Sequence, residues 1–392
     1  MAGIAAAMRL AEAGAEPILV ETRKRLGGRA TSLVDPQTGE TIDNCQHVVM
    51  GCCTNLIDLY ERLGVLDEIT WHRTLFWTVS SGEIESLRGG RLPAPMHLTP
   101  AMLRMKQFRG YRRHLMRGMW RIIRLGAEGR QAWRNRTFAE FLVSCKQPQE
   151  IVRRFWDVIV TSACNVDVHH CGAAYALQVF QEGFLSHPWS YTMGLSDVPL
   201  SSLYDPAPSV IEAAGGEVRL GESARSIAFE GRRVTGVVTE SGRIDASAVV
   251  SAVPFDRLDK LVSATLRRAD RRLEQLDGLR FSPILGVHLR FQERIMDLPH
   301  LVLAGADVQW LFNKGLDQRG EQHVHAVISA ADDWMALEKQ EIVARVMEDL
   351  VHALPSAKGL EPTHVRCIKE RRATFAATVG AEAHRPSVTP DL

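Results

Sequence analysis

The residues with the clearest chemical potential lie early in the chain, around a carboxylate that follows a short apolar run. Residues 18–20 form that run and Glu21 closes it, which predicts a buried parallel strand ending in an acid. Gly27 and Gly28 come six residues later, in a turn that favours glycine backbones, and Arg29 adds a fixed positive charge. At the end of a strand in a nucleotide-binding βαβ unit, such an acid receives the ribose hydroxyls. The spacing therefore indicates a nucleotide site.

A helix and its glycine must position this acid. Residues 2–13 are rich in alanine and predict a helix that Gly14 ends; the N-terminus of such a helix faces the pyrophosphate. Gly3 precedes Glu21 by eighteen residues, where the third glycine of G-x-G-x-x-G belongs. The first strand and the first two glycines do not precede it, so we expect the chain to open inside this motif.

The pattern Glu21-x5-Gly27-Gly28-Arg29-x2-Ser32 resembles the FAD signature of the flavin amine oxidase and phytoene desaturase superfamily. Three further segments are similar to its squalene-associated branch, the hydroxysqualene dehydroxylases: residues 43–47, 51–56 and 369–378. The likeness covers nearly the whole chain. One departure is Cys45, which stands where the family usually has glycine.

The resemblance implies an α/β fold in which a Rossmann-like FAD-binding domain is interleaved with an α+β substrate domain. The implied FAD-binding parts are residues 1–70 and 203–262, and the substrate parts are 71–202 and 263–370. Residues 371–392 begin the return to the FAD domain. The first strand and the closing segment are missing from this pattern, so we expect a chain truncated at both ends.

The cofactor implied by the resemblance is FAD. Strands at 224–229, 234–240 and 248–254 would form its second contact, although an ordinary β-meander has the same sequence pattern. The residues expected to bind FAD are Gly3, Glu21, Thr22, Arg23, Gly27, Gly28, Arg29, Asn44, Gln46, His47, Ala224, Ala252 and Pro254.

The implied reaction removes the hydroxyl group of hydroxysqualene and adds a hydride from reduced flavin, giving squalene. It requires a dry apolar site for a long isoprenoid chain and a proton donor for the leaving hydroxyl. His47 is the candidate proton donor and Arg371 a candidate for orienting the hydroxyl or a water. Alternatively, His47 and Gln46 only form hydrogen bonds with the flavin or the backbone.

Other functions remain open. A phytoene-type carotenoid desaturase would use the same fold to oxidise a carbon–carbon bond, and another member of the flavin amine oxidase family is a further alternative. Outside the enzymes, the chain would be an inactive fragment that binds FAD weakly, because two of the three usual pyrophosphate contacts would be absent.

Composition limits the partners. The 392 residues carry 47 lysines and arginines against 46 acids, so the net charge of +1 gives no bulk attraction to nucleic acid. Seven cysteines without a secretory signal predict reduced thiols in a cytoplasmic protein. Residues Cys164, His169, His170 and Cys171 do not have the spacing of a zinc site, so no metal is expected.

Residues 102–125 contain eight basic residues and no acid, beside an apolar stripe at helical spacing that includes Leu115, Met119 and Ile122. This predicts a basic amphipathic helix at an anionic membrane surface, and hence a peripheral position on the inner face of the cytoplasmic membrane. The alternative is a basic solvent-exposed face on a helix packed against the domain. Likewise, the aromatic residues of 180–200 either line a hydrophobic tunnel or fill the core.

Overall fold

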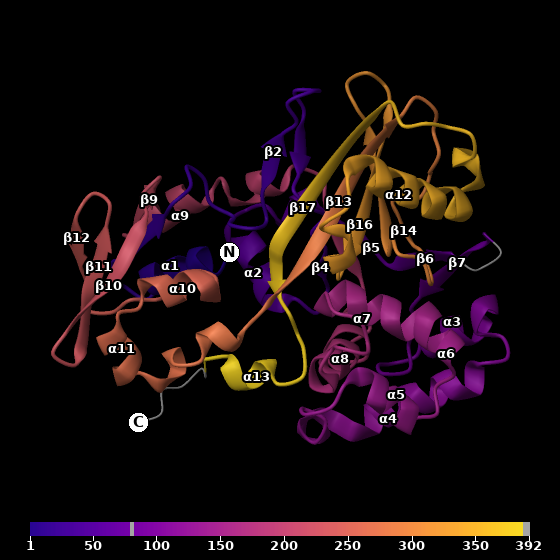
Figure 1. Cartoon of the computed structure of the whole chain (residues 1–392), viewed down its shortest axis with the longest axis horizontal. Coiled ribbons are helices and arrows are strands. Elements are labelled where there is room, and N and C mark those ends of the chain that lie inside the picture. The colour runs from indigo at the N-terminus through magenta and orange to yellow at the C-terminus, as the bar shows by residue number, and fades with distance from the viewer. Residues whose placement is uncertain (79–81, 387–392) are drawn as a thin grey trace.

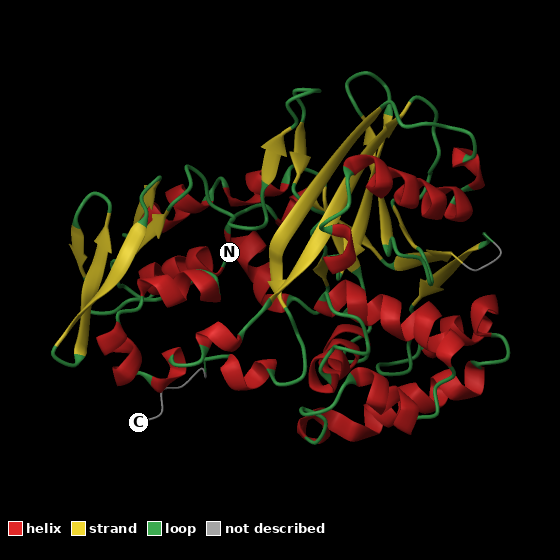
Figure 2. Cartoon of the chain, in the orientation of Figure 1, coloured by secondary structure: helices red, strands yellow, loops and turns green. Residues whose placement is uncertain are grey.

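A computed structural model describes residues 1–78 and 82–386, in three regions (Figures 1 and 2). One end of the molecule contains the first helix, the first strand and a β-meander. At the other end, a large sheet is covered on one side by a long helix and lies above a layer of helices. The N-terminus belongs to the first region (Figure 1).

The first region is built on a parallel pair of short strands. The helix α1 (Ala2–Glu12) leads into β1 (Ile18–Glu21), and α9 (Ala207–Ala213) leads into β9 (Glu217–Leu220). Ile18 pairs with Glu217 and Glu21 with Leu220, so this pairing joins segments 1–70 and 203–262. The helix and the parallel strand agree with the sequence, but β1 is not buried as predicted: Ile18 is 38% exposed, because β9 is the one strand that pairs with it in the described structure.

The meander follows β9 and differs from the prediction in its third strand. Its strands are β10 (Ala224–Glu230), β11 (Arg233–Thr239) and β12 (Arg243–Asp245). The expected strand at 248–254 is instead an irregular segment that leads into α10 (Phe255–Leu261) and α11 (Ala264–Ala269).

The large sheet has seven strands and combines an early segment with the later part of the chain. The strands are β6 (Thr74–Thr78), β7 (Ile84–Arg88), β13 (Phe281–Phe291), β14 (His300–Val302), β15 (Trp310–Leu316), β16 (Gln322–Ser329) and β17 (His364–Phe375). Their order across the sheet is β17–β13–β16–β15–β14–β6–β7. Strand β17 continues to Phe375, past the domain boundary expected at residue 370.

The two faces of this sheet have different neighbours. Helix α12 (Lys339–Ala353) covers one face, where its buried Ile342, Val346 and Leu350 belong to one core cluster with Leu285 and Val287 of β13. The opposite face meets the helical layer and the segment around residue 45. Alternation along β13 and β16 therefore sends every second side chain toward that segment.

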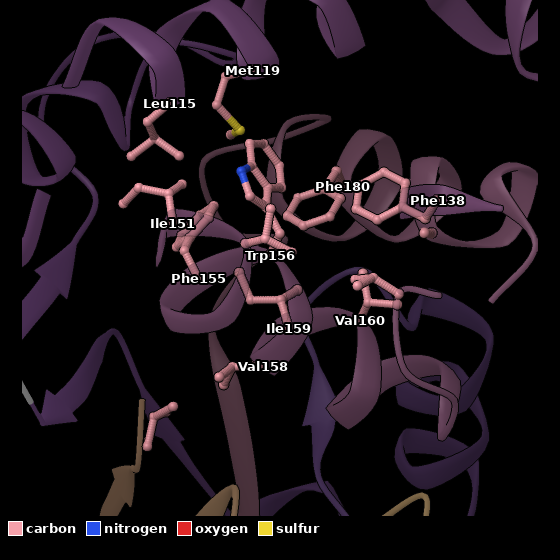
Figure 3. Close-up of a cluster of buried hydrophobic side chains, with 14 of the residues drawn as sticks. Leu115, Met119, Phe138, Ile151, Phe155, Trp156, Val158, Ile159, Val160 and Phe180 are labelled. Atoms are coloured by element: carbon pink, nitrogen blue, oxygen red, sulfur yellow. The ribbon is translucent and has the colours of Figure 1, made fainter. Parts of the chain in front are cut away.

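The helical layer holds the largest core cluster. Its helices are α3 (Thr99–Arg104), α4 (Arg112–Gln131), α5 (Phe138–Ser144), α6 (Gln149–Ile151), α7 (Asp157–Cys164) and α8 (Ala173–Gln178). Figure 3 shows the aromatic centre of the cluster, where the ring of Phe180 lies 4.9 Å from that of Trp156 and 5.8 Å from that of Phe138. Phe180 thus fills the core, which is the second of the two roles expected for residues 180–200.

The single basic helix expected over residues 102–125 is wrong in extent. Gly110 has φ +90° and separates α3 from α4. Leu115, Met119 and Ile122 of α4 are at most 4% exposed and belong to the core cluster, so this stripe packs inside the protein. No helix in the described part of the chain is both long and apolar enough to cross a bilayer.

Smaller elements connect these regions. They are β2 (Ser32–Val34), β3 (Thr41–Asp43), β4 (Val49–Met50), β5 (Ile69–His72), β8 (Met193–Ser196), α2 (Thr54–Arg62) and α13 (Ala381–His384). Strand β2 pairs with β3, and β8 lies between β4 and β5. The segment between β3 and β4 is held between the first region and the large sheet.

Candidate cofactor site and active site

The N-terminal turn of α1 lies unusually close to two other segments. A Cβ atom on Gly3 would be 3.2 Å from Cδ1 of Leu19 in β1 and 3.3 Å from Cβ of Ala252. A larger residue would push the helix away from both. Gly3 therefore performs the packing role of the third motif glycine, and the approach brings Ala252 and the nearby Pro254 to the start of α1.

The end of β1 is tied to the glycine turn. The Glu21 carboxylate accepts a hydrogen bond from the backbone N–H of Arg23 (2.9 Å), and the Arg23 guanidinium donates to the backbone oxygen of Gly28 (2.9 Å). Thr22 between them is exposed. The backbone N–H of Glu222 donates to the Glu21 backbone oxygen (3.0 Å), which brings the start of β10 at Ala224 near this acid.

The two glycines of the turn have different surroundings. Gly27 has φ +111°, and a Cβ there would lie 2.6 Å from the backbone oxygen of Ala30 and 2.9 Å from the Tyr204 ring. Gly28 has φ +65°, with no heavy atom within 4 Å of the corresponding position. Gly27 is therefore required by the fold, whereas Gly28 borders open space.

Arg29 connects this turn to the end of the large sheet. Its guanidinium donates to the backbone oxygens of Arg372 (3.1 Å) and Ala373 (2.5 Å) in β17. The Asn44 amide nitrogen donates to the backbone oxygen of Arg29 (2.9 Å). The Asn44 Oδ1 atom is buried and accepts no hydrogen bond from the described residues, so an acceptor remains available beside the turn.

Asp43 fixes the start of the segment that carries Asn44 and His47. Its Oδ1 accepts hydrogen bonds from Oγ of Ser32 (2.8 Å) and the backbone N–H of Leu200 (2.9 Å). Its Oδ2 lies 3.5 Å from Nζ of Lys314, and that ammonium also donates to Oε1 of Gln46 (3.2 Å). The carboxylate is thus fully engaged and orders both ends of the segment.

Three buried histidines of β13 and β16 continue this network. Nε2 of His288 donates to the backbone oxygen of Asp43 (3.0 Å), and Nδ1 of His288 lies 2.9 Å from Nε2 of His323. The rings of His288 and His325 stack with centroids 3.9 Å apart. Burial lowers the pKa of His288 to about 4, so the ring is neutral near pH 7. Because a carbonyl only accepts, His288 carries its proton on Nε2 and accepts from His323 through Nδ1.

These histidines were not predicted from the sequence, although the sequence contains a signal for them. His323 and His325 are two residues apart on either side of Val324, and His288 lies between the apolar residues Val287 and Leu289. This alternation separates a polar face from an apolar one. The register that pairs His288 with His325 across the two strands can be seen only in the structure.

His47 is held as a neutral ring. Its Nδ1 lies 3.1 Å from the backbone oxygen of Cys45 and must donate to it. Desolvation by burial lowers the pKa of His47 below its usual 6.5, and the neutral ring therefore leaves Nε2 as an acceptor near pH 7. This geometry fits the alternative role as a hydrogen-bonding residue better than the role of proton donor.

Arg371 does not join His47. In β17 it alternates with Glu370, which pairs with Ile284 of β13, and its Nη2 donates to the backbone oxygen of Met335 (3.0 Å). Met335 belongs to the cluster on the α12 face of the sheet. The bond to Met335 places the Arg371 guanidinium on the α12 side of the large sheet, so the structure does not support the expectation that Arg371 orients a substrate beside His47.

An apolar surface adjoins the segment from Cys45 to Met50. Cys45 is buried in one cluster with Phe312 and Val327 of the large sheet, and burial raises the pKa of its thiol to about 12. Val48, Met50, Ile284 and Trp310 are among the partly buried apolar side chains that pack against this cluster. Met50, Ile284 and Trp310 come from the strands β4, β13 and β15.

The cysteine and histidine residues near 164–171 have other surroundings. Nδ1 of the exposed His170 lies 2.6 Å from Asp167, and Cys171 is buried in the core. Residues 1–78 and 82–386 contain no group of three or more histidine, cysteine or acidic residues placed to hold a metal ion.

Comparison with known proteins supplies the remaining evidence. The family model described as flavin containing amine oxidoreductase matches residues 1–391. Hydroxysqualene dehydroxylase of Sinorhizobium fredii is 26% identical, covering 98% of this chain and 87% of that protein; 15-cis-phytoene desaturase of Synechococcus elongatus is 23% identical, covering 98% and 86%. A structure of putrescine oxidase bound to putrescine has the same fold, with a TM-score of 0.71 and 18% identity over 97% of this chain and 86% of that one.

Proposed function

Because the chain belongs to the flavin-containing amine oxidoreductase family and is therefore an FAD-dependent oxidoreductase, we propose that it reductively dehydroxylates hydroxysqualene to squalene. The cofactor and the broad reaction type follow from the family. The particular substrate rests on the 26% identical relative and on the apolar surface beside Cys45.

The residues around the glycine turn fit FAD. Gly28 borders open space, and Oδ1 of Asn44 is a buried acceptor without a partner among the described residues, as expected where a ligand donates a hydrogen bond. Glu21 would accept from the ribose hydroxyls, while the N-terminus of α1 near Gly3 would face the pyrophosphate. When bound and reduced, FAD supplies a hydride.

The observation that carries the substrate class is the set of half-buried apolar side chains around the core cluster that includes Cys45. Val48, Met50 and Ile284 would exclude water from an isoprenoid chain, and Trp310 adds an aromatic ring stacked on Phe312 (5.6 Å between centroids). Apolar and aromatic walls tolerate an allylic cation that bulk water would trap. A small diamine would gain little from such a surface.

The proposed reaction is balanced by one hydride and one proton. The carbon–oxygen bond breaks, a carbon–hydrogen bond forms, and the hydroxyl group leaves as water after taking up a proton; an external reductant must then restore the reduced flavin. Neutral His47, fixed by its bond to Cys45, offers Nε2 as an acceptor that orients a hydroxyl or a water. On this account the proton comes from a group other than His47.

The test is an anaerobic incubation of the FAD-loaded protein, reduced with dithionite, with hydroxysqualene and chromatographic detection of squalene. We expect one squalene per reduced flavin in a single turnover. In a parallel incubation, phytoene and a quinone acceptor are added to the oxidised protein. Desaturated carotenoid without squalene would contradict the proposal and favour the desaturase function, in line with the 23% identical relative.

A further inference from the structure

One face of α4 concentrates positive charge at the surface. Arg113, Arg117 and Arg124 are spaced by four and seven residues and are exposed, as is the neighbouring Arg121. None of the four forms an ion pair with a residue that the structure describes. With a net charge of only +1 for the whole chain, this basic face is a local feature.

An apolar group lies within the same face. Trp120, between Arg117 and Arg124 in the helical turn, is 53% exposed. Together with Arg117, Arg121, Arg124 and Leu125 it lines an open hollow of about 500 Å³ whose other wall is Ser144 and Cys145 at the end of α5. Val143, the residue before that wall, is 74% exposed, more than any other large apolar side chain that the structure describes.

The opposite face of α4 is already used by the fold. Leu115, Met119 and Ile122 are buried in the core cluster, so the helix is anchored and cannot roll to present them. In Figure 1, α4 and α5 lie at the lower edge of the helical layer, on the side away from the large sheet, where a flat partner has access.

We propose that this face, consisting of Arg113, Arg117, Trp120, Arg121, Arg124 and Val143, docks the protein on a bilayer with anionic headgroups. Guanidinium groups bind lipid phosphates in bidentate fashion, and tryptophan prefers the boundary between headgroups and hydrocarbon. Val143 favours a bilayer over a nucleic acid or an acidic protein, because a sugar–phosphate backbone or a carboxylate surface would leave that side chain in water. The bilayer thus buries the apolar groups and neutralises the cations together.

The sequence predicted membrane contact through a basic amphipathic helix over residues 102–125; because the apolar stripe of that helix is buried, the present proposal assigns the contact to the arginine face. It does not depend on which flavin reaction the protein performs. Contact would be shallow and dominated by electrostatics, since one tryptophan and one valine provide the insertion. It would therefore weaken as salt is added.

The experiment is vesicle flotation of the full FAD-loaded chain, with phosphatidylcholine vesicles that contain or lack phosphatidylglycerol. We expect binding only to the anionic vesicles, and loss of about fivefold in affinity for each arginine removed. The test variant is Arg117→Ala/Arg124→Ala, for which we expect a loss of about 25-fold. The matched control is Arg232→Ala/Arg233→Ala, which removes two exposed arginines at the β10–β11 turn, at the other end of the molecule, and should bind as the wild type does.

A second measurement separates lipid from other anions. Trp120→Ala should weaken flotation by several-fold while leaving retention on an RNA oligonucleotide unchanged, and soluble glycerol phosphate should not compete with vesicles at equal phosphate concentration. Equal binding of the two arginine double variants would overturn the proposal, as would equal binding to neutral vesicles. Retention on RNA without binding to anionic vesicles would assign the face to a different partner. Unchanged thermal unfolding of all variants controls for misfolding.

Discussion

Nε2 of His288 lies 3.0 Å from the backbone oxygen of Asp43, although 245 positions separate the two residues. This hydrogen bond joins the large sheet to the segment that carries Asn44 and His47. The Asp43 carbonyl fixes the tautomer of His288, Nδ1 of His288 accepts from His323 on the neighbouring strand, and His325 stacks on its ring. The sheet that forms the apolar surface thus also determines the position of residues expected at the flavin.

His288→Phe should separate packing from hydrogen bonding, because phenylalanine keeps an aromatic ring against His325 and loses the donor to Asp43. Leaving that buried carbonyl without its partner should lower the free energy of unfolding by about 1–3 kcal/mol. Denaturant unfolding measures the loss, and the visible spectrum of bound flavin should shift if the segment moves. His288→Gln, which retains a donor, is the control; equal losses in both variants would mean that the hydrogen bond is not the cause.

Stability should depend on pH through the same residue. The folded-state pKa of His288 is about 4, against 6.5 for an unperturbed histidine, so the unfolded chain binds the extra proton between these values. The stabilising effect is therefore present above about pH 6.5 and is lost as the pH falls toward 4, by at most about 3 kcal/mol. Unfolding curves across this range should show a shallower slope for His288→Gln than for the wild type. Identical slopes would contradict a neutral buried His288.

The two turn glycines should respond differently to alanine. Gly27→Ala places a Cβ 2.6 Å from the backbone oxygen of Ala30 and should destabilise the protein without FAD by several kcal/mol, since both the contact and the positive φ are unfavourable. Gly28→Ala meets no neighbouring atom and should cost only about 1–2 kcal/mol of backbone strain.

For FAD affinity we expect the opposite order, with a larger loss in Gly28→Ala than in Gly27→Ala. A methyl group on Gly28 projects into the space proposed for the cofactor, so Gly28→Ala should weaken FAD binding more than its small stability loss explains. Flavin titration followed by protein fluorescence measures the affinity. Wild-type affinity in Gly28→Ala would place the cofactor elsewhere.

Cys45 should behave as a buried, protonated thiol. It is 6% exposed, and burial raises its pKa to about 12, so native protein should react with a thiol reagent at this position far more slowly than unfolded protein. Cys45→Gly, which restores the residue usual in the family, should lower stability by about 1–2 kcal/mol through loss of packing. Unchanged flavin affinity and turnover in that variant would show that the departure from the family is tolerated; improved turnover would show that Cys45 limits the site. Rapid native labelling of Cys45 would contradict its burial.

Local patterns predicted the nucleotide half of the fold well, because its signals lie within a few residues of one another. Glu21 at the strand end and the glycine turn at Gly27 are examples. The position of Arg371 could not be predicted locally: its guanidinium donates to the backbone oxygen of Met335, and this contact depends on how β17 docks against the α12 side of the sheet.

The features that could not be predicted from the sequence depend on contacts between residues far apart in the chain. The bond of His288 to Asp43 depends on the docking of a sheet against a loop far away in sequence, and no local spacing encodes it. On α4 the apolar stripe around Leu115 was recognised correctly, but an amphipathic pattern does not say whether protein or membrane covers it. Burial of that stripe left the arginine face, with Trp120, as the surface available to a partner.

We expect this chain to bind FAD between Glu21, the glycine turn and Asn44. The most direct test is the visible absorbance spectrum of the purified chain after incubation with FAD and gel filtration, for the wild type, for Glu21→Gln and for the matched surface variant Glu16→Gln. We predict that the wild type and Glu16→Gln retain a flavin band that migrates with the protein, and that Glu21→Gln retains much less. A folded wild-type protein that emerges colourless, or a Glu21→Gln variant with an undiminished band, would contradict the account.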